Sequence, residues 1–360
     1  MTSSAHRSSW GRLIAALTVG LTLLAGCGAT GATGTESPSA STVSSGTQTP
    51  ADTATPVEGI EPPVIGLTYV PNIQFAPFYV AEDDGLLAGA AAGAELRHHG
   101  ASEGLFTALA SGAEQFVVAG GDEILQARAE GVDVVAVSAY YHRYPARIIV
   151  PADSPIQTMA DLRGHTVGLP GRFGENWFAL LIGLEQAGLS LDDVTVEEIG
   201  YTQQAALMTG KVDAVVGFSN GDAISFEQAG FATRSIDPEP PLVSICLATT
   251  SAYAEANPRV VADVVGALDA AIASVSEDPE HALDIAAGHI PDFTGEATIA
   301  TARAVLDATI DLFAAPDGRV AGQLDEAQWQ TMAEAMDAAG LLSAPVDGAE
   351  AMTNQYRLRR

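Results

Sequence analysis

Residues 64–87 read VIGLTYVPNIQFAPFYVAEDDGLL, and this stretch decides the fold. Its first part, Val64 to Val70, is a largely apolar run of strand-forming residues, which predicts a buried strand. A loop follows, and we expect a helix from about Pro77 to Leu87. A strand, a loop and a helix in this order form the repeating unit of a parallel α/β sheet.

The same alternation continues along the chain. Further strands are expected at 94–98, 115–119, 132–139, 147–150, 165–169, 194–199 and 212–218. Helices or helical turns are expected at 102–111 (with Ser102 as the N-cap), 122–130, 159–163, 175–187, 203–208 and 222–229. Gly188 is expected to end one of these helices as a C-cap glycine. From Pro258 to Leu341 the chain is expected to be almost entirely helical.

The two sets of elements predict an α/β protein with two lobes, each a parallel sheet with helices on both faces. Crossings are expected near Val150–Pro151 and near Pro238–Pro241, with the run Leu242 to Ala248 returning to the first lobe. Lobe 1 would comprise 62–150 and 242–355, and lobe 2 would comprise 151–241. Ligands of doubly wound sheets lie beyond the carboxyl ends of the strands, so we expect a ligand cleft between the lobes.

The N-terminus has the three parts of a secretory signal. A basic start with Arg7 and Arg12 precedes an apolar run, Leu13 to Leu24, and small residues lead into Cys27. The run is shorter than the about 20 residues that span a bilayer. The pattern favours a removable signal over 1–26, with a short membrane anchor as the alternative. Residues 27–60 are rich in Gly, Ala, Ser, Thr and Pro, which predicts a flexible tether.

The segment Leu24–Cys27 resembles a bacterial lipobox, in which the cysteine is acylated. Cys27 would then hold the chain on the outer face of the cell membrane, with several acyl chains needed for stable attachment. Cys246 is the other cysteine of the sequence, and its apolar surroundings predict a small buried side chain without a disulfide partner. The spacing of cysteines excludes a zinc site of the usual kind, and we expect no metal and no cofactor.

The charge balance limits the partners. The chain has 45 acidic and 16 basic residues in 360, a net charge of −29, which argues against binding to nucleic acid. About 300 residues remain after the tether, enough for two lobes with cores of their own. We expect a monomer with a small-molecule ligand.

The loops that should follow the strands carry aromatic rings together with amide, carboxylate and a few basic groups. In the first lobe the candidate ligand-binding residues are Asn72, Gln74, Phe75, Phe78, Tyr79, Gly121, Asp122, Tyr141 and Arg143. In the second lobe they are Arg172, Glu175, Asn176, Trp177, Asn220 and Asp222. The glycines before Asp122 would let a ligand approach backbone N–H groups at a helix start.

This composition fits an aromatic heterocycle stacked between rings and oriented by polar groups. An anion fits less well, although Arg143 or Arg172 could bind one. Each aromatic residue has core packing as its alternative role, and Asp122 and Asp222 have helix capping. The adjacent histidines, His98 and His99, are expected at an exposed strand end.

At these residues the chain resembles the solute-binding proteins of ABC importers that bind thiamine pyrimidine precursors, riboflavin, sulfonates and nitrate. The resemblance covers about 62–250 and rests on Pro71–Ala81 with Gly85, Ala119–Asp122, Ala127–Gly131, Tyr144–Pro145, Asp161–Gly164 with Val167–Gly168, and Gly210–Ala214. It implies a periplasmic-binding-protein-like fold that closes on a ligand and docks on a membrane permease, which works with an ATPase.

Within that group the sequence is most similar to riboflavin-binding and pyrimidine-precursor-binding members, through Tyr144–Pro145 and the rings of Phe75, Phe78 and Tyr79. It departs from them at Asp83–Leu87, where an aromatic residue often follows the glycine, and at Gly120–Gly121. A sulfonate or nitrate binder is the alternative. A pyrimidine synthase of thiamine biosynthesis is a further one, but such enzymes rely on a cysteine-rich segment that this chain lacks, so we expect no enzyme. A sensory receptor domain is disfavoured because no transmembrane portion follows.

Overall fold

The computed structural model describes residues 61–100, 103–315 and 317–357, all within one compact unit of the chain, 52–360. Cys27 and Ser102 lie outside the described residues, so lipidation and the Ser102 N-cap stay predictions. No helix in these ranges is long and apolar enough to cross a membrane.

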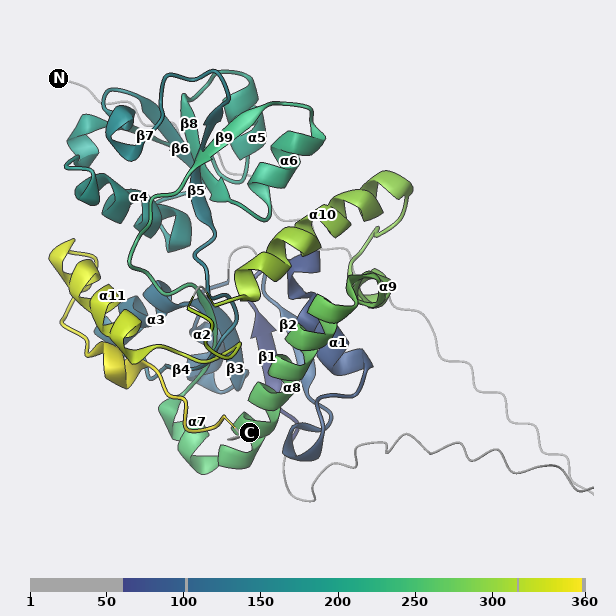
Figure 1. The fold of residues 1–360 in the computed structure, drawn as a ribbon. Coiled ribbons are helices and arrows are strands. Elements are labelled where there is room, and N and C mark those ends of the chain that lie inside the picture. Colours follow the sequence, from purple (N-terminus) through teal and green to yellow (C-terminus); the bar gives the residue numbers. More distant parts are fainter. Residues whose placement is uncertain (1–60, 101–102, 316, 358–360) are drawn as a thin grey trace, which may run out of the picture. The chain divides into compact units, whose positions relative to one another are not determined.

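The first sheet has the strand order β2-β1-β3-β10-β4 (Figure 1). Its strands are β1 (Val64–Leu67), β2 (Glu95–His98), β3 (Phe116–Gly120), β4 (Val135–Ala139) and β10 (Ile245–Thr249). β1 pairs in parallel with β2 and β3, whereas β10 runs antiparallel to β3 and β4. The predicted return of the chain to the first sheet after Pro241 is therefore confirmed.

The second sheet has the order β7-β6-β8-β5-β9. Its strands are β5 (Ala146–Pro151), β6 (Thr166–Leu169), β7 (Thr195–Glu198), β8 (Ala214–Phe218) and β9 (Thr233–Ile236). β6 is parallel to β7 and β8, and β5 is antiparallel to β8 and β9. Both sheets are thus mixed, because one strand in each arrives by a crossing from the other sheet, and the expectation of purely parallel sheets was wrong.

The first crossing also differs from the expected one. β5 pairs with β8 and β9, so the strand expected at 147–150 belongs to the second sheet, and the chain passes between sheets at 140–145 rather than near Val150–Pro151. We call 140–145 the first connection and 237–244 the second connection. The first connection has six residues and the second has eight. Because both are short, they stay close to the ends of the strands that they join.

The α-helices that flank the first sheet or follow its connections are α1 (Ala76–Asp83), α2 (Thr107–Ser111), α3 (Gly121–Ala129) and α7 (Ser251–Ala256). Those of the second sheet are α4 (Gly174–Gln186), α5 (Gln203–Met208) and α6 (Asp222–Gln228). The C-terminal part holds α8 (Pro258–Glu277), α9 (Pro279–His289), α10 (Glu296–Phe313) and α11 (Glu326–Ala338). Short 3-10 turns are η1 (Ile73–Phe75), η2 (Gly89–Ala91), η3 (Met159–Leu162), η4 (Leu191–Asp193) and η5 (Gly348–Ala351).

Helix ends follow local chemistry. Gly188 takes a φ of +69° just after α4, as the C-cap prediction requires. The long helical C-terminal part is divided where Asp278 caps α9 by accepting from the His281 N–H and Pro279 opens the next helix. The helix expected from Ser102 begins only at Thr107.

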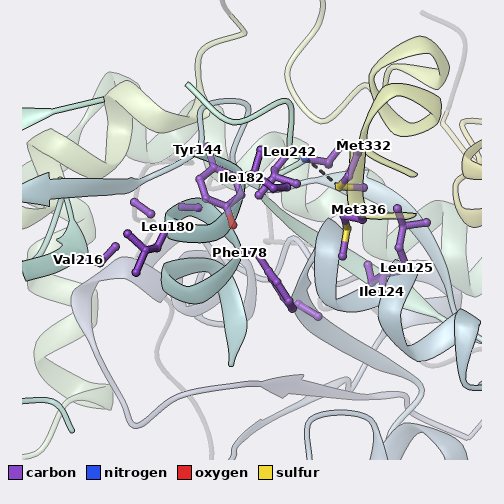
Figure 2. Close-up of a cluster of buried hydrophobic side chains, with 14 of the residues drawn as sticks. Ile124, Leu125, Tyr144, Phe178, Leu180, Ile182, Val216, Leu242, Met332 and Met336 are labelled. Carbon is purple, nitrogen blue, oxygen red and sulfur yellow. Dashed lines mark hydrogen bonds between the residues drawn. The ribbon is translucent and has the colours of Figure 1, made fainter. Parts of the chain in front are cut away.

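The core extends along the first sheet, where every residue of β3 and β4 is buried. α1 packs against α8 and α9, and α8 buries one apolar face along its whole length. A separate cluster contains residues of both sheets, both connections and α11. Figure 2 shows Tyr144 and Leu242, one from each connection, in this cluster with Met332 of α11, whose sulfur accepts from the Val243 N–H at 3.1 Å.

Candidate functional site

Three exposed aromatic rings follow strand ends of the two sheets. Tyr69 comes after β1 and is 40% exposed, Phe173 comes after β6 and is 58% exposed, and Tyr201 comes after β7 and is 65% exposed. The rings of Tyr69 and Tyr201 lie 6.2 Å apart at 56°. Exposed rings that meet from separate loops are a sign of a binding surface, and Tyr69 and Tyr201 meet in this way. These three, which we call the ring set, are residues that the sequence analysis did not single out.

The aromatic residues that the sequence did single out in the first lobe are buried instead. Phe75, Phe78, Tyr79 and Tyr141 all belong to the core, as the packing alternative stated. The reason is that α1 is covered by α8 and α9, so its rings have no solvent-facing side. Tyr79 stacks on His289 at 4.4 Å, and its hydroxyl lies 3.1 Å from His98 Nε2.

The polar residues of the same loop shape the backbone. Asn72 caps η1, its Oδ1 accepting from the Gln74 N–H at 3.1 Å, and its own N–H donates to the Tyr79 hydroxyl at 3.2 Å. The Gln74 carbonyl oxygen accepts from the Tyr140 hydroxyl. Asn72 and Gln74 therefore hold the turn between β1 and α1.

A group of three carboxyl side chains, the carboxyl cluster, lies at the start of α3 and α4. It consists of Asp122 and Glu123 after β3 and Glu175 after β6. The Tyr144 hydroxyl donates to Asp122 Oδ2 and to the Glu175 carbonyl oxygen at 3.1 Å. The Ser244 hydroxyl donates to Glu175 Oε1 at 3.1 Å. The cluster thus joins residues from both sheets and both connections.

Glu123 binds the strand end directly. Its Oε2 accepts from the Gly120 N–H at 3.0 Å, which satisfies a donor at the start of α3. Asp122 is not the N-cap that the alternative proposed, because the helix starts before it and its Oδ2 accepts from Tyr144. Glu123 is also among the groups that raise the pKa of the Tyr201 hydroxyl, after burial and Tyr69, so Glu123 lies near Tyr201.

Burial and mutual repulsion favour the protonated forms in this cluster. Loss of hydration and, second, the charge of Glu123 raise the pKa of Asp122 to about 8. Burial and then the charges of Asp122 and Glu123 raise the pKa of Glu175 well above its usual range. Burial also raises the pKa of Glu123. In the described part of the chain, no arginine, lysine or histidine forms an ion pair with these three carboxyls.

Asn220, after β8, lies beside Tyr141 of the first connection. The Asn220 side chain donates from Nδ2 to Thr309 Oγ1 of α10 at 2.9 Å. Burial and then the Glu175 charge raise the pKa of the Tyr141 hydroxyl, while the side chains of Asn220 and Thr309 oppose the shift, so all three groups surround that hydroxyl. Asn220 therefore lies beside Tyr141 and Thr309.

Three buried polar atoms near this cluster have no hydrogen-bond partner among the described residues. They are Tyr141 Oη, Asn176 Oδ1 and Asn220 Oδ1. Each comes from a different element, and two are carbonyl oxygens. Buried polar atoms are nearly always paired in folded proteins, so such a group is a sign of a site that takes a further partner.

The remaining predicted residues lie at the edges of this arrangement. Trp177 carries the Arg172 guanidinium over its ring at 5.1 Å, and Arg172 Nε donates to Glu198 at 3.3 Å. Arg143 is exposed and donates from Nε to the Ala314 carbonyl oxygen at 3.3 Å. Asp222 accepts from the Phe218 N–H at 2.8 Å, which closes the turn after β8.

Gly121 and Gly174 show why small residues stand at these helix starts. A side chain at Gly121 would come within 3.0 Å of Val243, so glycine at this position makes room for the second connection. Gly174 has a φ of +66°, which favours glycine, and lies against Glu123 Oε1.

Other clusters in the described ranges are engaged within the protein. His99 is buried against Glu114, with both carboxylate oxygens 2.9 Å from its Nε2, so the expectation of an exposed strand end was wrong for this histidine. Glu82, Asp83 and His289 could bring ligand atoms near one metal ion, but the two ring nitrogens of His289 face different carboxylates. Cys246 is buried and free, as expected.

Sequence comparison places this arrangement in a known family. The family model described as NMT1/THI5 like matches residues 72–282, more than half of the chain. The chain belongs to the NMT1/THI5-like family.

Two curated relatives extend over most of the chain. The riboflavin-binding protein RibY of Chloroflexus aurantiacus is 32% identical over 318 residues, covering 85% of this chain and 90% of that protein. The formylaminopyrimidine-binding protein of Halalkalibacterium halodurans is 24% identical over 308 residues, covering 84% and 93%. Both are binding proteins by name.

Solved structures share the fold. The periplasmic aliphatic sulphonate-binding protein SsuA from Escherichia coli superposes with a TM-score of 0.63 at 20% identity, covering 83% of this chain and 95% of that one. The desulfurization enzyme DszB also superposes, with a TM-score of 0.52 at 18% identity, covering 82% and 97%. The predicted two-sheet binding-protein fold is thereby confirmed, and the fold alone admits both binders and enzymes.

Proposed function

We propose that this protein is an exported solute-binding lipoprotein of an ABC importer that captures a small aromatic heterocycle, riboflavin or a thiamine pyrimidine precursor, and delivers it to a membrane permease. The observation that carries the proposal is the ring set, Tyr69, Phe173 and Tyr201, exposed on strand-end loops, with Tyr201 near Glu123 of the carboxyl cluster. Flat exposed rings bind flat ligands by stacking, and nearby polar groups fix their orientation.

The relatives support the same ligand class. Family membership and the names of two relatives, a riboflavin binder and a formylaminopyrimidine binder, agree on a planar nitrogen heterocycle. These names also favour a binder over an enzyme, so we propose that the protein releases its ligand unchanged. Anchoring through Cys27 would keep the loaded protein beside its permease.

We further propose that the ligand closes two lobes about the two connections. One lobe would hold the first sheet with the C-terminal helices, and the other would hold the second sheet, 146–236. The second connection contains Glu239, whose φ of +48° is unusual for a residue with a side chain. Hinges are commonly a few residues outside regular elements, which fits both connections.

The ring set can be tested by titrating purified protein with riboflavin and following the quenching of flavin fluorescence. Tyr201→Ala should weaken binding about tenfold or more, because stacking of a base on an aromatic ring contributes about 1–3 kcal/mol and 1.4 kcal/mol is tenfold. Val320→Ala is the matched control, since Val320 is 67% exposed and outside the ring set.

A buried ring provides the contrast. Tyr79→Ala should lower the free energy of unfolding by about 3–5 kcal/mol, the cost of removing a large buried side chain. The fraction of Tyr79→Ala that remains folded should bind riboflavin with the affinity of the wild type. If Tyr201→Ala binds riboflavin or hydroxymethylpyrimidine as tightly as the wild type, the ring set is not the site. If neither heterocycle binds the wild type, the proposed ligand class is wrong.

A further inference from the structure

The orientation of the Asn220 amide is fixed by its neighbour. Thr309 Oγ1 donates its one proton to the Val305 carbonyl oxygen at 2.7 Å, so it can only accept from Asn220. Nδ2 must therefore face Thr309, and Oδ1 must face away from it. The Asn220 side chain is 2% exposed, and Oδ1 has no partner among the described residues.

This oxygen lies in surroundings that accept hydrogen bonds. Asn220 lies beside the Tyr141 hydroxyl, and Asn176 also has a buried Oδ1 without a partner in the described chain. Amide oxygens are acceptors, whereas Tyr141 supplies a single hydroxyl donor. A ligand that satisfies these oxygens has to bring N–H or O–H groups.

The charges around the cluster point the same way. The two arginines that could attract an anion are engaged elsewhere, Arg172 with Glu198 and Trp177, and Arg143 with the Ala314 carbonyl oxygen. In the described ranges no arginine, lysine or histidine forms an ion pair with the carboxyl cluster, so an anionic group brought there would find no opposite charge.

We propose that the site selects its ligand by accepting hydrogen bonds, with Asn220 Oδ1 and Asn176 Oδ1 receiving N–H or amino groups of a neutral or cationic heterocycle, and that it rejects sulfonate and nitrate anions. This inference rests on the proposed function and narrows its ligand class. Asn220 is a specificity-determining residue in this reading, and Thr309 is a positioning residue that orients its amide.

The test measures affinity and stability together on the full chain. Asn220→Leu removes the acceptor oxygen, which has no partner, and also the hydrogen bond to Thr309; these two changes act in opposite directions on stability, so the unfolding midpoint in urea should change little. Affinity for riboflavin or hydroxymethylpyrimidine, measured by calorimetry, should nevertheless fall at least tenfold, about 1.4 kcal/mol. If Asn220 had a purely structural role, affinity would not fall while the unfolding midpoint is maintained. Asn257→Leu, which changes an asparagine bonded to the Tyr253 carbonyl oxygen, should leave affinity unchanged.

Anions provide the second arm. Butanesulfonate and nitrate should show no binding to the wild type at the concentration at which the heterocycle saturates the site. Binding of either anion with an affinity equal to that of the heterocycle would overturn the inference. So would an unchanged affinity in Asn220→Leu while Tyr201→Ala still loses binding, and in that case the proposed function would survive. If only the anions bind, the inference and the proposed function both fall.

Discussion

Asp122 should make the protein less stable as the pH rises through neutrality, and the sign follows from its burial. Its folded-state pKa is raised to about 8, chiefly by loss of hydration and then by Glu123, whereas a carboxyl in the unfolded chain titrates near about 4. Between these values the folded protein keeps a proton that the unfolded chain has released. The free energy of unfolding therefore falls with rising pH in this window and levels off above about pH 8.

The magnitude can be worked from the same values. One such group changes the free energy of unfolding by about 1.4 kcal/mol per pH unit while the pH is well below the folded pKa. From pH 6.5 to 7.5 the wild type should lose about 1 kcal/mol through Asp122, and Glu175, whose pKa is also raised by burial and repulsion, adds to the loss. The window must begin at pH 6.5 because burial lowers the pKa of His142 to about 4, and that group acts with the opposite sign below its ordinary pKa.

Urea unfolding at several pH values between 6.5 and 8, followed by tryptophan fluorescence and circular dichroism, measures the slope. Asp122→Asn keeps an acceptor for the Tyr144 hydroxyl but carries no titrating proton, so its slope should be shallower by about 1 kcal/mol per pH unit. Asp161→Asn is the control, because hydrogen bonds from Gln157 and Thr158 lower the pKa of Asp161 and its titration lies far below this window. A slope in Asp122→Asn equal to that of the wild type would refute the reasoning.

Two further predictions concern the whole protein. Cys27→Ser should move the protein from the membrane fraction of cells to the soluble fraction, because the anchoring acyl chains would be lost; a variant that stays with the membrane would show that the lipobox interpretation is wrong. Small-angle scattering should show a smaller radius of gyration when the wild type is saturated with its heterocycle, because closure about the two connections brings the lobes together; an unchanged radius would contradict closure.

The strands that the sequence predicts best are those that are buried on both faces. β3 and β4 are apolar at nearly every position, which is a signal that needs no knowledge of their neighbours. β9, Thr233–Ile236, was not predicted, because it is an edge strand with polar residues and only one buried position. The helix expected at 102–111 begins later, at Thr107, and Gly104 within the expected span is a poor helix former.

The residues of β5 do not by themselves predict to which sheet this strand belongs. Its sequence, Ala146–Pro151, is apolar enough for either core, and its assignment depends on pairing with β8 and β9 much later in the chain. The same dependence on distant partners explains the misplaced aromatic residues. Phe78 and Tyr79 follow a strand end, as ligand-binding rings would, but α8 and α9 cover them.

The ring set did leave a signal in the sequence, although it was overlooked. Tyr69 stands at the end of the first predicted strand, Phe173 lies in the loop after β6, and Tyr201 follows Gly200 after β7. Each occupies a strand-end loop, the position where α/β sheets bind ligands. The sequence does not show which loops are covered by helices from later in the chain. This covering decides whether a ring is exposed or belongs to the core.

The carboxyl cluster would link the proposed binding to the proposed closure. Tyr144, in the first connection, donates both to Asp122 beside the first sheet and to the Glu175 backbone beside the second. Ser244, in the second connection, donates to the Glu175 carboxyl. Both segments that join the lobes are therefore hydrogen-bonded to this cluster. A ligand that hydrogen-bonds to these carboxyls would change the hydrogen-bond partners of both connections at once. A ligand shifts a protein between open and closed states only if it binds the two states with different affinity, and such a change of partners would provide that difference.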